Sequence, residues 1–348
     1  MGGERPEQKK FNRLMEKLKN DEFKYTPKEE KQIDWAKYDK AQINEINNML
    51  LLMRDMMDEA CKRLKIEEYP EKKERGRPPK PPRDLAKAVL MQQYFGVSNR
   101  VTEGLVNLFR EKMEIHSRFS YKAIERAYEI PEVTLILQEV FRIAQEPIND
   151  KEHEFSIDGS GLPTSTKQNW EQDKKKSETK GYEKMVAMVG TTYKMISSVT
   201  FTENPEANES PYLESLVMET AKKYDEVDLV TGDAAYISRD NCNIIASIGA
   251  IPRIYPKRGI TLQQKGSKAW TDMLLSFIID PQKWLEEYHS RSISETANST
   301  YKRDFPVPLR RKINLRRKQE AFARVCDYNL KRRCYLKYLE GIPLKVGG

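Results

Sequence analysis

The sequence predicts a mixed α/β protein, in which a five-stranded sheet flanked by helices follows an all-helical N-terminal region and precedes a basic helical tail. Three observations indicate this. Helical periodicity fills the first 150 residues, strand and helix patterns alternate from 151 to 303, and Lys and Arg concentrate after residue 302. With 348 residues, of which 38% are apolar, the chain is long enough for two or three domains.

The first predicted region, residues 1–70, is highly charged and helical. Within it apolar residues recur at alternating spacings of three and four, which is a heptad pattern. These positions are Ile43, Ile46, Leu50, Met53, Met57, Ala60 and Leu64. Two interpretations stand side by side: the seam pairs two chains into a homodimer, or it packs onto the protein's own domain.

Residues 71–83, EKKERGRPPKPPR, form a basic, proline-rich linker. The run from Arg75 to Pro78 resembles an AT-hook core, whose arginines enter the narrow minor groove of A·T-rich DNA. Arg75 and Arg77 are therefore candidate DNA contacts. A stiff linker of this composition would carry the same four residues.

Residues 84–150 contain four helical segments separated by short breaks. The second begins after Ser98, a suitable N-cap. Short helices with tight turns are typical of a helix-turn-helix domain, although many helical bundles never bind DNA. On this hypothesis Lys122 and Arg126 contact the groove or a phosphate.

Strand patterns begin after residue 150. FSID predicts a strand that ends at Asp158, and KMVAMVGTT with KMISSVTFT predicts a hairpin. A helix follows Ser210, then a strand ending just before Asp233, a second helix, the strand AIPRIYP, and a last long helix capped by Asp280. The predicted order is β-β-β-α-β-α-β-α.

The last helix contains YHSRSISETANSTYKR, residues 288–303. At helical spacing Tyr288, Arg291, Glu295 and Lys302 fall within an arc of roughly 60°. Along this stripe one carboxylate is flanked by two cations. A solvated salt-bridge ladder on a helix surface would show the same stripe.

Asp158 and Asp233 each follow a predicted strand and precede small residues, which let a bulky backbone come close. Either aspartate alone is also ordinary turn chemistry. Together with Glu295, they offer the hard oxygen ligands that Mg²⁺ prefers. Two such ions, roughly 3.5–4 Å apart, catalyse in-line phosphoryl transfer.

This order of elements and acids resembles the ribonuclease-H-like core of DDE transposases. The spacing from Tyr288 to Lys302 matches the signature Y-(2)-R-(3)-E-(6)-K of transposases from bacterial and archaeal insertion sequences. TGDAAY resembles their second-aspartate motif, with an aromatic at Tyr236. One departure is visible, since about 25 residues separate AIPRIYP from Asp280, where some relatives insert a large β-rich domain.

The resemblance implies that Asp158, Asp233 and Glu295 bind two Mg²⁺ ions, with Mn²⁺ as a substitute, while Tyr288, Arg291 and Lys302 hold the DNA end. The expected enzyme binds the inverted-repeat ends of its element, cleaves them and joins the 3′-hydroxyls to target double-stranded DNA, as a homodimer. Two alternatives are an inactive, domesticated DNA-binding protein and a ribonuclease-H-like nuclease. The three acids argue against the first, and the Tyr-Arg-Glu-Lys stripe argues against the second.

The net charge of the chain is +8, and residues 302–337 alone carry 13 Lys or Arg against 3 Asp or Glu. Such a concentrated basic segment predicts a polyanionic partner, although a solubilising tail would share its composition. The candidate phosphate contacts in it are Arg310, Arg311, Arg316 and Arg317.

The remaining composition excludes several classes. Four cysteines without a CxxC pair and three histidines argue against disulfide frameworks and multi-histidine zinc sites. No apolar signal or run of about 18 apolar residues occurs, which predicts a soluble, intracellular protein and no membrane partner. The resemblance to insertion-sequence transposases implies a cytoplasmic, nucleoid-associated protein of a prokaryote. Trp170, Trp270 and Trp284 are either core residues or stacking partners for an unpaired base.

The predicted domains are a charged helical region (1–70), a basic linker (71–83), a helical DNA-binding domain (84–150), a catalytic domain (151–303) and a basic tail (304–348).

Overall fold

The structure is a computed structural model that describes residues 5–23, 25–26, 32–66, 79–164, 182–202, 204 and 207–345. The chain forms two compact units, each assembled from three segments. We call them the sheet unit (Met1–Gln32, Ile148–Ser160 and Lys184–Ser299) and the helical unit (Ile33–Pro147, Gly161–Glu183 and Thr300–Gly348). The domain boundaries given above follow chain order and stay a prediction.

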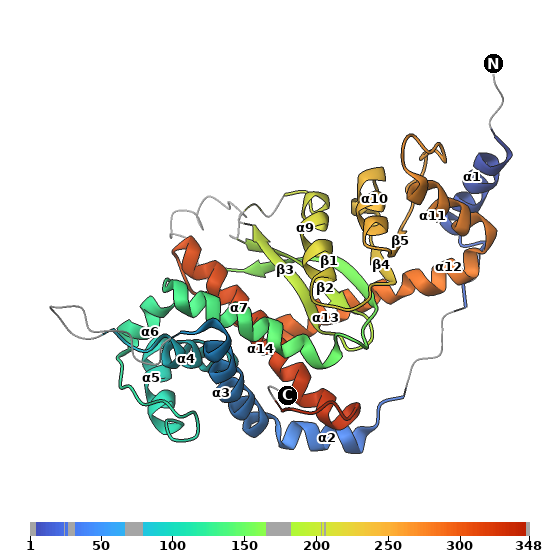
Figure 1. Ribbon diagram of the computed structural model, residues 1–348. Helices are drawn as coiled ribbons and strands as arrows, with labels where there is room; N and C mark the ends of the chain where they lie inside the picture. The colour runs from blue at the N-terminus through green and yellow to red at the C-terminus, as the bar shows by residue number, and fades with distance from the viewer. Residues whose placement is uncertain are drawn as a thin grey trace, which may run out of the picture. The chain divides into compact units, whose positions relative to one another are not determined.

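The sheet unit is built on a mixed five-stranded sheet, as predicted, and its strand order is β3-β2-β1-β4-β5 (Figure 1). Its strands are β1 (Glu154–Pro163), β2 (Tyr182–Gly190), β3 (Ile196–Thr202), β4 (Leu229–Gly232) and β5 (Ile251–Ile254). β2 and β3 form the predicted antiparallel hairpin, and β4 is parallel to both β1 and β5. The expectation that the first strand ends at Asp158 is wrong, because β1 continues to Pro163, whose carbonyl accepts a hydrogen bond from Leu309 N–H.

The helices between the strands follow the predicted order, whereas three helices of this unit follow β5 where one was predicted. The helices of the sheet unit are α1 (Pro6–Lys19), α9 (Leu213–Ala221), α10 (Arg239–Ser247), α11 (Lys268–Ile279), α12 (Pro281–Tyr288) and α13 (Ser292–Asp304), with the 3-10 turns η2 (Ser210–Tyr212), η3 (Ala234–Tyr236) and η4 (His289–Arg291). Asp280 caps α12 as expected, since its carboxylate accepts from Lys283 N–H at 3.0 Å.

The predicted single long helix at residues 281–303 is wrong, because η4 separates α12 from α13. Three serines account for the break. Ser290, Ser292 and Ser294 each donate a side-chain hydrogen bond to the carbonyl three residues earlier. Such back-bonding competes with the regular helical ladder and favours a tighter turn.

The helical unit contains α2 (Trp35–Ile43), α3 (Glu45–Leu64), α4 (Pro82–Phe95), α5 (Asn99–Leu108), α6 (Tyr121–Ala127), α7 (Pro131–Gln145) and α14 (Asn314–Leu339), with η1 (Glu146–Ile148) after α7. The four helices α4 to α7 and the Ser98 cap of α5 were predicted. α14 is the predicted C-terminal helix. It packs against α2, α3, α4 and α7, and its residues Val325, Leu330 and Leu336 are fully buried in the core.

The heptad positions lie mostly on α3. Leu50, Met53 and Met57 are at most 1% exposed and pack within the helical unit, whereas Ile43 ends α2 and is 83% exposed. Because Met49, Leu52 and Met56 are buried as well, the apolar arc is wider than a coiled-coil seam. The hypothesis that this seam pairs two chains is therefore wrong, and its packing onto the protein's own core is confirmed.

Among the described residues, no helix is both long and apolar enough to span a bilayer.

Candidate active site

Asp158, inside β1, and Asp233, directly after β4, lie at neighbouring positions on adjacent strands. β1 and β4 are paired in parallel, with Ile157 opposite Gly232. Asp158 and Asp233 are therefore the next residues along two adjacent strands. Asp233 also caps η3, because its carboxylate accepts from Ala235 N–H at 2.7 Å. The parallel register thus places two acids, 75 residues apart in sequence, side by side at the C-terminal end of β4.

Helix α13 packs directly on β1 beside these acids. The hydroxyl groups of Ser156 and Ser294, both fully buried, are hydrogen-bonded at 3.0 Å. Further along the helix, Asn298 Nδ2 donates to the Asp158 carboxylate at 3.0 Å. The helix that carries Glu295 is therefore fixed against the strand that carries Asp158.

The environment of Asp158 disfavours its charge. Burial raises the pKa of this carboxyl to about 6, while the Asn298 hydrogen bond and the positive charge of Arg291 oppose the shift. The ionised form of a poorly solvated carboxylate is stabilised when a cation lies beside it. Asp158 thus has the character expected of a cation ligand.

Glu295 is exposed and forms an ion pair with Arg291, at 2.5 Å between Nη2 and Oε1. The guanidinium of Arg291 lies 5.9 Å from the ring centre of Tyr288. Burial raises the pKa of Tyr288 to about 12, so its phenol keeps its proton and can donate to phosphate. Three members of the predicted stripe are therefore neighbours despite the break in the helix. The fourth, Lys302, lies exposed on the part of α13 that belongs to the helical unit.

The described residues fit a hard cation by their chemistry. Asp158, Asp233 and Glu295 offer carboxylate oxygens, and two of them extend from adjacent strands. In the conformation that the structure describes, no three His, Cys, Asp or Glu side chains lie close enough together to hold a metal ion. Glu295 contacts Arg291 instead. A shared metal site at these three acids stays a prediction.

Two residues of this region escaped the sequence reasoning. Asn298 lies three residues after Glu295 and four before Lys302, so the helical stripe itself could have indicated it. Glu209, whose charge contributes to the raised pKa of Asp158, directly precedes η2. No motif includes Glu209, and its proximity depends on tertiary packing.

Two of the three candidate tryptophans do not offer their rings to a base. Trp270 is 4% and Trp284 1% exposed, and the Trp284 ring stacks on Tyr288 at 5.4 Å. Their interpretation as core residues is confirmed for these two. Trp170 lies outside the described residues.

The predicted DNA contacts on α6 are accessible, since Lys122 and Arg126 are both exposed. Arg75 and Arg77 lie outside the described part of the chain.

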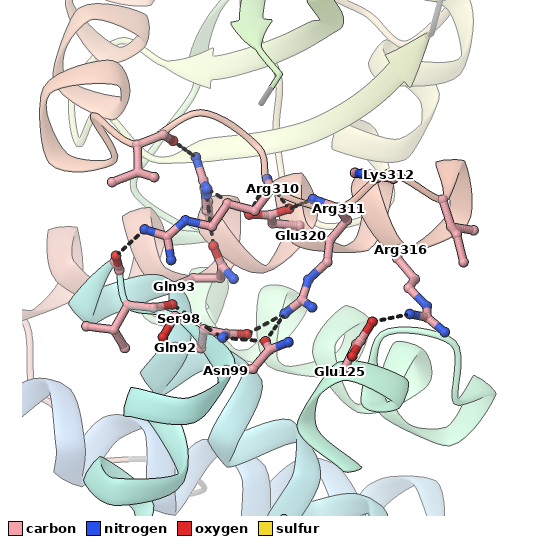
Figure 2. A pocket seen from close by; sticks show the side chains of 15 residues that line it. Gln92, Gln93, Ser98, Asn99, Glu125, Arg310, Arg311, Lys312, Arg316 and Glu320 are labelled. Atoms are coloured by element: carbon pink, nitrogen blue, oxygen red, sulfur yellow. Dashed lines mark hydrogen bonds and ion pairs between the residues drawn. The ribbon is translucent and has the colours of Figure 1, made fainter. Parts of the chain in front are cut away.

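Several predicted phosphate contacts of the C-terminal segment line one pocket of about 470 Å³ in the helical unit (Figure 2). Arg311 donates to Gln92 and Asn99, and Arg316 pairs with Glu125 at 3.0 Å. Arg310 and Lys312 are exposed at the same pocket.

Arg317 is not among the pocket residues, and it pairs with the fully buried Glu183 at 2.9 Å. Part of the basic excess is thus used inside the unit.

Residues 150–330, just over half of the chain, match the family described as "Transposase DDE domain". The chain belongs to this transposase family. Residues 38–112 also match a family described as "Transposase domain (DUF772)", which begins in α2 and ends after α5. The predicted resemblance to insertion-sequence transposases is thereby confirmed.

A relative of this transposase is described as "Probable transposase for insertion sequence element ISA1214" from Archaeoglobus fulgidus. It is 25% identical over 253 residues, which cover 71% of this chain and 74% of that protein. The shared region therefore spans most of both chains.

Proposed function

We propose that this transposase binds the inverted-repeat ends of its own element, cleaves them and joins the freed 3′-hydroxyls to target double-stranded DNA. The observation that supports the proposal most strongly is the parallel pairing of Ile157 with Gly232, which brings Asp158 and Asp233 side by side on adjacent strands. Beside it, α13 is fixed to Asp158 through Asn298.

Asp158, Asp233 and Glu295 would together hold two Mg²⁺ ions, for which Mn²⁺ would substitute. When bound, such ions polarise a phosphoryl oxygen and increase the acidity of the attacking hydroxyl or water. Glu295 becomes available as a ligand when its ion pair with Arg291 opens. The guanidinium released in that way can grip a phosphate with two parallel hydrogen bonds.

The remaining contacts position the DNA. Tyr288 donates from its protonated phenol, while Lys302 places a point charge further along α13. In the helical unit, Arg310 and Lys312 offer exposed cations at the pocket, and Lys122 with Arg126 offer two more on α6. We infer that these four contact backbone phosphates, which fix register without reading sequence. If the enzyme acts as a homodimer on DNA, its interface does not use the buried residues Leu50, Met53 and Met57 of α3.

The test is the variant Glu295→Gln, which keeps the size of the side chain and removes its charge. We expect cleavage and joining to be abolished while affinity for the element's ends is retained. Arg291→Ala keeps all three acids, and the misplaced DNA end should lower the cleavage rate by about 10²-fold.

Glu219→Gln is the matched control, because Glu219 forms another exposed i,i+4 ion pair, with Lys223, in the same unit. A Glu295→Gln protein that still cleaves DNA in Mg²⁺ contradicts the proposal. Cleavage without any joining of a pre-cut end identifies a nuclease instead.

A further inference from the structure

A fourth carboxylate of the sheet unit, that of Glu209, lies beside residues that closely follow Asp158 and Asp233 in the sequence. It pairs with Lys184 of β2 at 2.8 Å and accepts a hydrogen bond from the Tyr236 hydroxyl at 2.9 Å. Its side chain is 18% exposed. Tyr236 is fully buried and closes η3, the turn that Asp233 caps. Glu209 is therefore linked to the Asp233 turn through a buried phenol.

The same carboxylate rests on the backbone beside Asp158. A Cβ atom added to Gly159 would overlap it, since the three atoms nearest to that position all belong to the Glu209 carboxyl group. The φ angle of Gly159 lies outside the left-handed region, so an alanine would meet no backbone strain there. The glycine is needed for space, and the space is taken by Glu209.

A second tie holds the Glu209 segment against the Asp233 turn. Asn241 of α10, which is 5% exposed, donates from Nδ2 to the Ser210 hydroxyl at 2.8 Å and to the Tyr236 carbonyl at 2.7 Å. The residue after Glu209 and the backbone of Tyr236 thus share one buried amide. The carboxylate and its phenol partner are held together by two independent contacts.

We propose that Glu209 is a positioning residue that sets the separation of Asp158 and Asp233 by bridging Gly159 and Tyr236. This inference rests on the proposed function, because it assumes that the two aspartates hold metal. It accounts for two features of the sequence at once, the glycine after the first aspartate and the aromatic three residues after the second. Lys184 forms an ion pair with Glu209, which offsets part of the repulsion between this carboxylate and the nearby Asp158.

The first test measures Mn²⁺ affinity from the paramagnetic resonance signal of the free ion, in the full chain without DNA. Removal of a group that orients metal ligands costs about 10- to 100-fold in affinity. We expect Glu209→Ala to weaken Mn²⁺ binding by about 10-fold. Glu209→Gln, which still accepts from Tyr236, should remain within about threefold of the parent. Tyr236→Phe, which removes one hydroxyl, should weaken binding in the same direction as Glu209→Ala.

Glu219→Ala is the matched control, since it also removes a carboxylate that pairs with a lysine of the sheet unit. It should leave Mn²⁺ affinity unchanged. Parental affinity in both Glu209→Ala and Tyr236→Phe overturns the inference.

The second test uses the overlap at Gly159. Gly159→Ala should displace the Glu209 carboxylate and weaken Mn²⁺ binding by about 10-fold. In the Glu209→Ala background the space is free, so the same change should cause no further loss. Additive losses in the double variant overturn the inference, because they show that the two residues act independently.

Asp233→Asn separates this inference from the proposed function. If Asp233→Asn weakens Mn²⁺ binding and Glu209→Ala does not, the proposed metal site is retained and only the role of Glu209 is overturned. A parent whose Mn²⁺ affinity is unchanged by Asp233→Asn overturns both.

Discussion

One carboxylate of the sheet unit and two carboxylates of the helical unit differ in how their charges are compensated. Around the candidate active site, Asp158 receives a neutral amide from Asn298, and burial raises its pKa to about 6. In the helical unit, Arg317 pairs with the buried Glu183 and Arg324 with the buried Glu320, each at 2.9 Å. The acid in the sheet unit is left poorly compensated, whereas these arginines are neutralised by partners of their own unit.

The difference teaches that a charge count along the chain does not say which charges face a ligand. Residues 302–337 carry the largest basic excess, yet much of α14 is core. The half-buried carboxylate of Asp158 is less conspicuous in the sequence than the basic segment, yet its pKa is clearly shifted in the fold. Perturbed groups of this kind gather at functional sites.

The largest expected effect tests the core of the helical unit. Leu50→Glu with Met57→Glu places two charges at positions of α3 that are at most 1% exposed. Burying unpaired charges is so costly that we expect a loss above about 5 kcal/mol, which unfolds the helical unit. Circular dichroism during thermal unfolding measures it.

Ile43→Glu is the control for this pair, because Ile43 is 83% exposed, and it should cost less than about 0.5 kcal/mol. A folded double variant with half the mass of the parent in sedimentation would assign the seam to a dimer after all.

The next effect separates two kinds of arginine in the C-terminal segment. Arg317→Ala leaves Glu183 buried without its cation, and removal of one partner of such a pair costs about 3–5 kcal/mol. Arg310→Ala changes an exposed residue and should alter the unfolding free energy by less than about 0.5 kcal/mol.

For DNA binding we expect the larger effect from Arg310→Ala and the smaller effect from Arg317→Ala. Arg310→Ala should weaken binding to unrelated sequences alike and reduce the slope of log affinity against log salt by about 1. Chemical denaturation measures the unfolding free energy, and binding titrations at several salt concentrations measure the salt dependence of DNA affinity. An unchanged salt slope would remove Arg310 from the DNA interface.

The smallest effect concerns Asp158 without divalent metal. Its pKa is about 6 in the folded chain against the ordinary 3.8, so between these values the folded state binds more protons than the unfolded state. Stability therefore falls as pH rises through this window, and the penalty is complete above pH 6. Asp158→Asn removes it and should stabilise the protein by roughly 1–2 kcal/mol at pH 7.

Thermal unfolding in a chelator at pH 7 and at pH 3.5 measures this change. The gain should largely disappear at the lower pH, where the parental carboxyl is protonated in the folded state and mostly protonated in the unfolded state. A destabilised Asp158→Asn protein at pH 7 would show that the carboxylate is better compensated than its burial indicates.

The sequence by itself determined the local elements and the order in which they follow one another. Two strand-like segments with a tight spacing between them predicted the β2–β3 hairpin, helical spacing predicted α4 to α7, and Asp280 and Ser98 predicted two caps, because each of these signals depends on residues a few positions apart. The stripe from Tyr288 to Lys302 was visible for the same reason. Its interruption by η4 was missed, since serine back-bonding competes with the helix without changing its periodicity.

Tertiary structure alone decided which charged residues were left for chemistry. Glu209 meets Gly159 and Tyr236 through packing of segments about 50 and 27 residues away, which no local pattern encodes. The burial of α14 turned Arg317 and Arg324 into internal ion pairs, and the docking of α13 on β1 gave Asp158 its amide partner. The physical reason is that the cost or use of a charge depends on its solvation and its partners, and both are set by long-range packing.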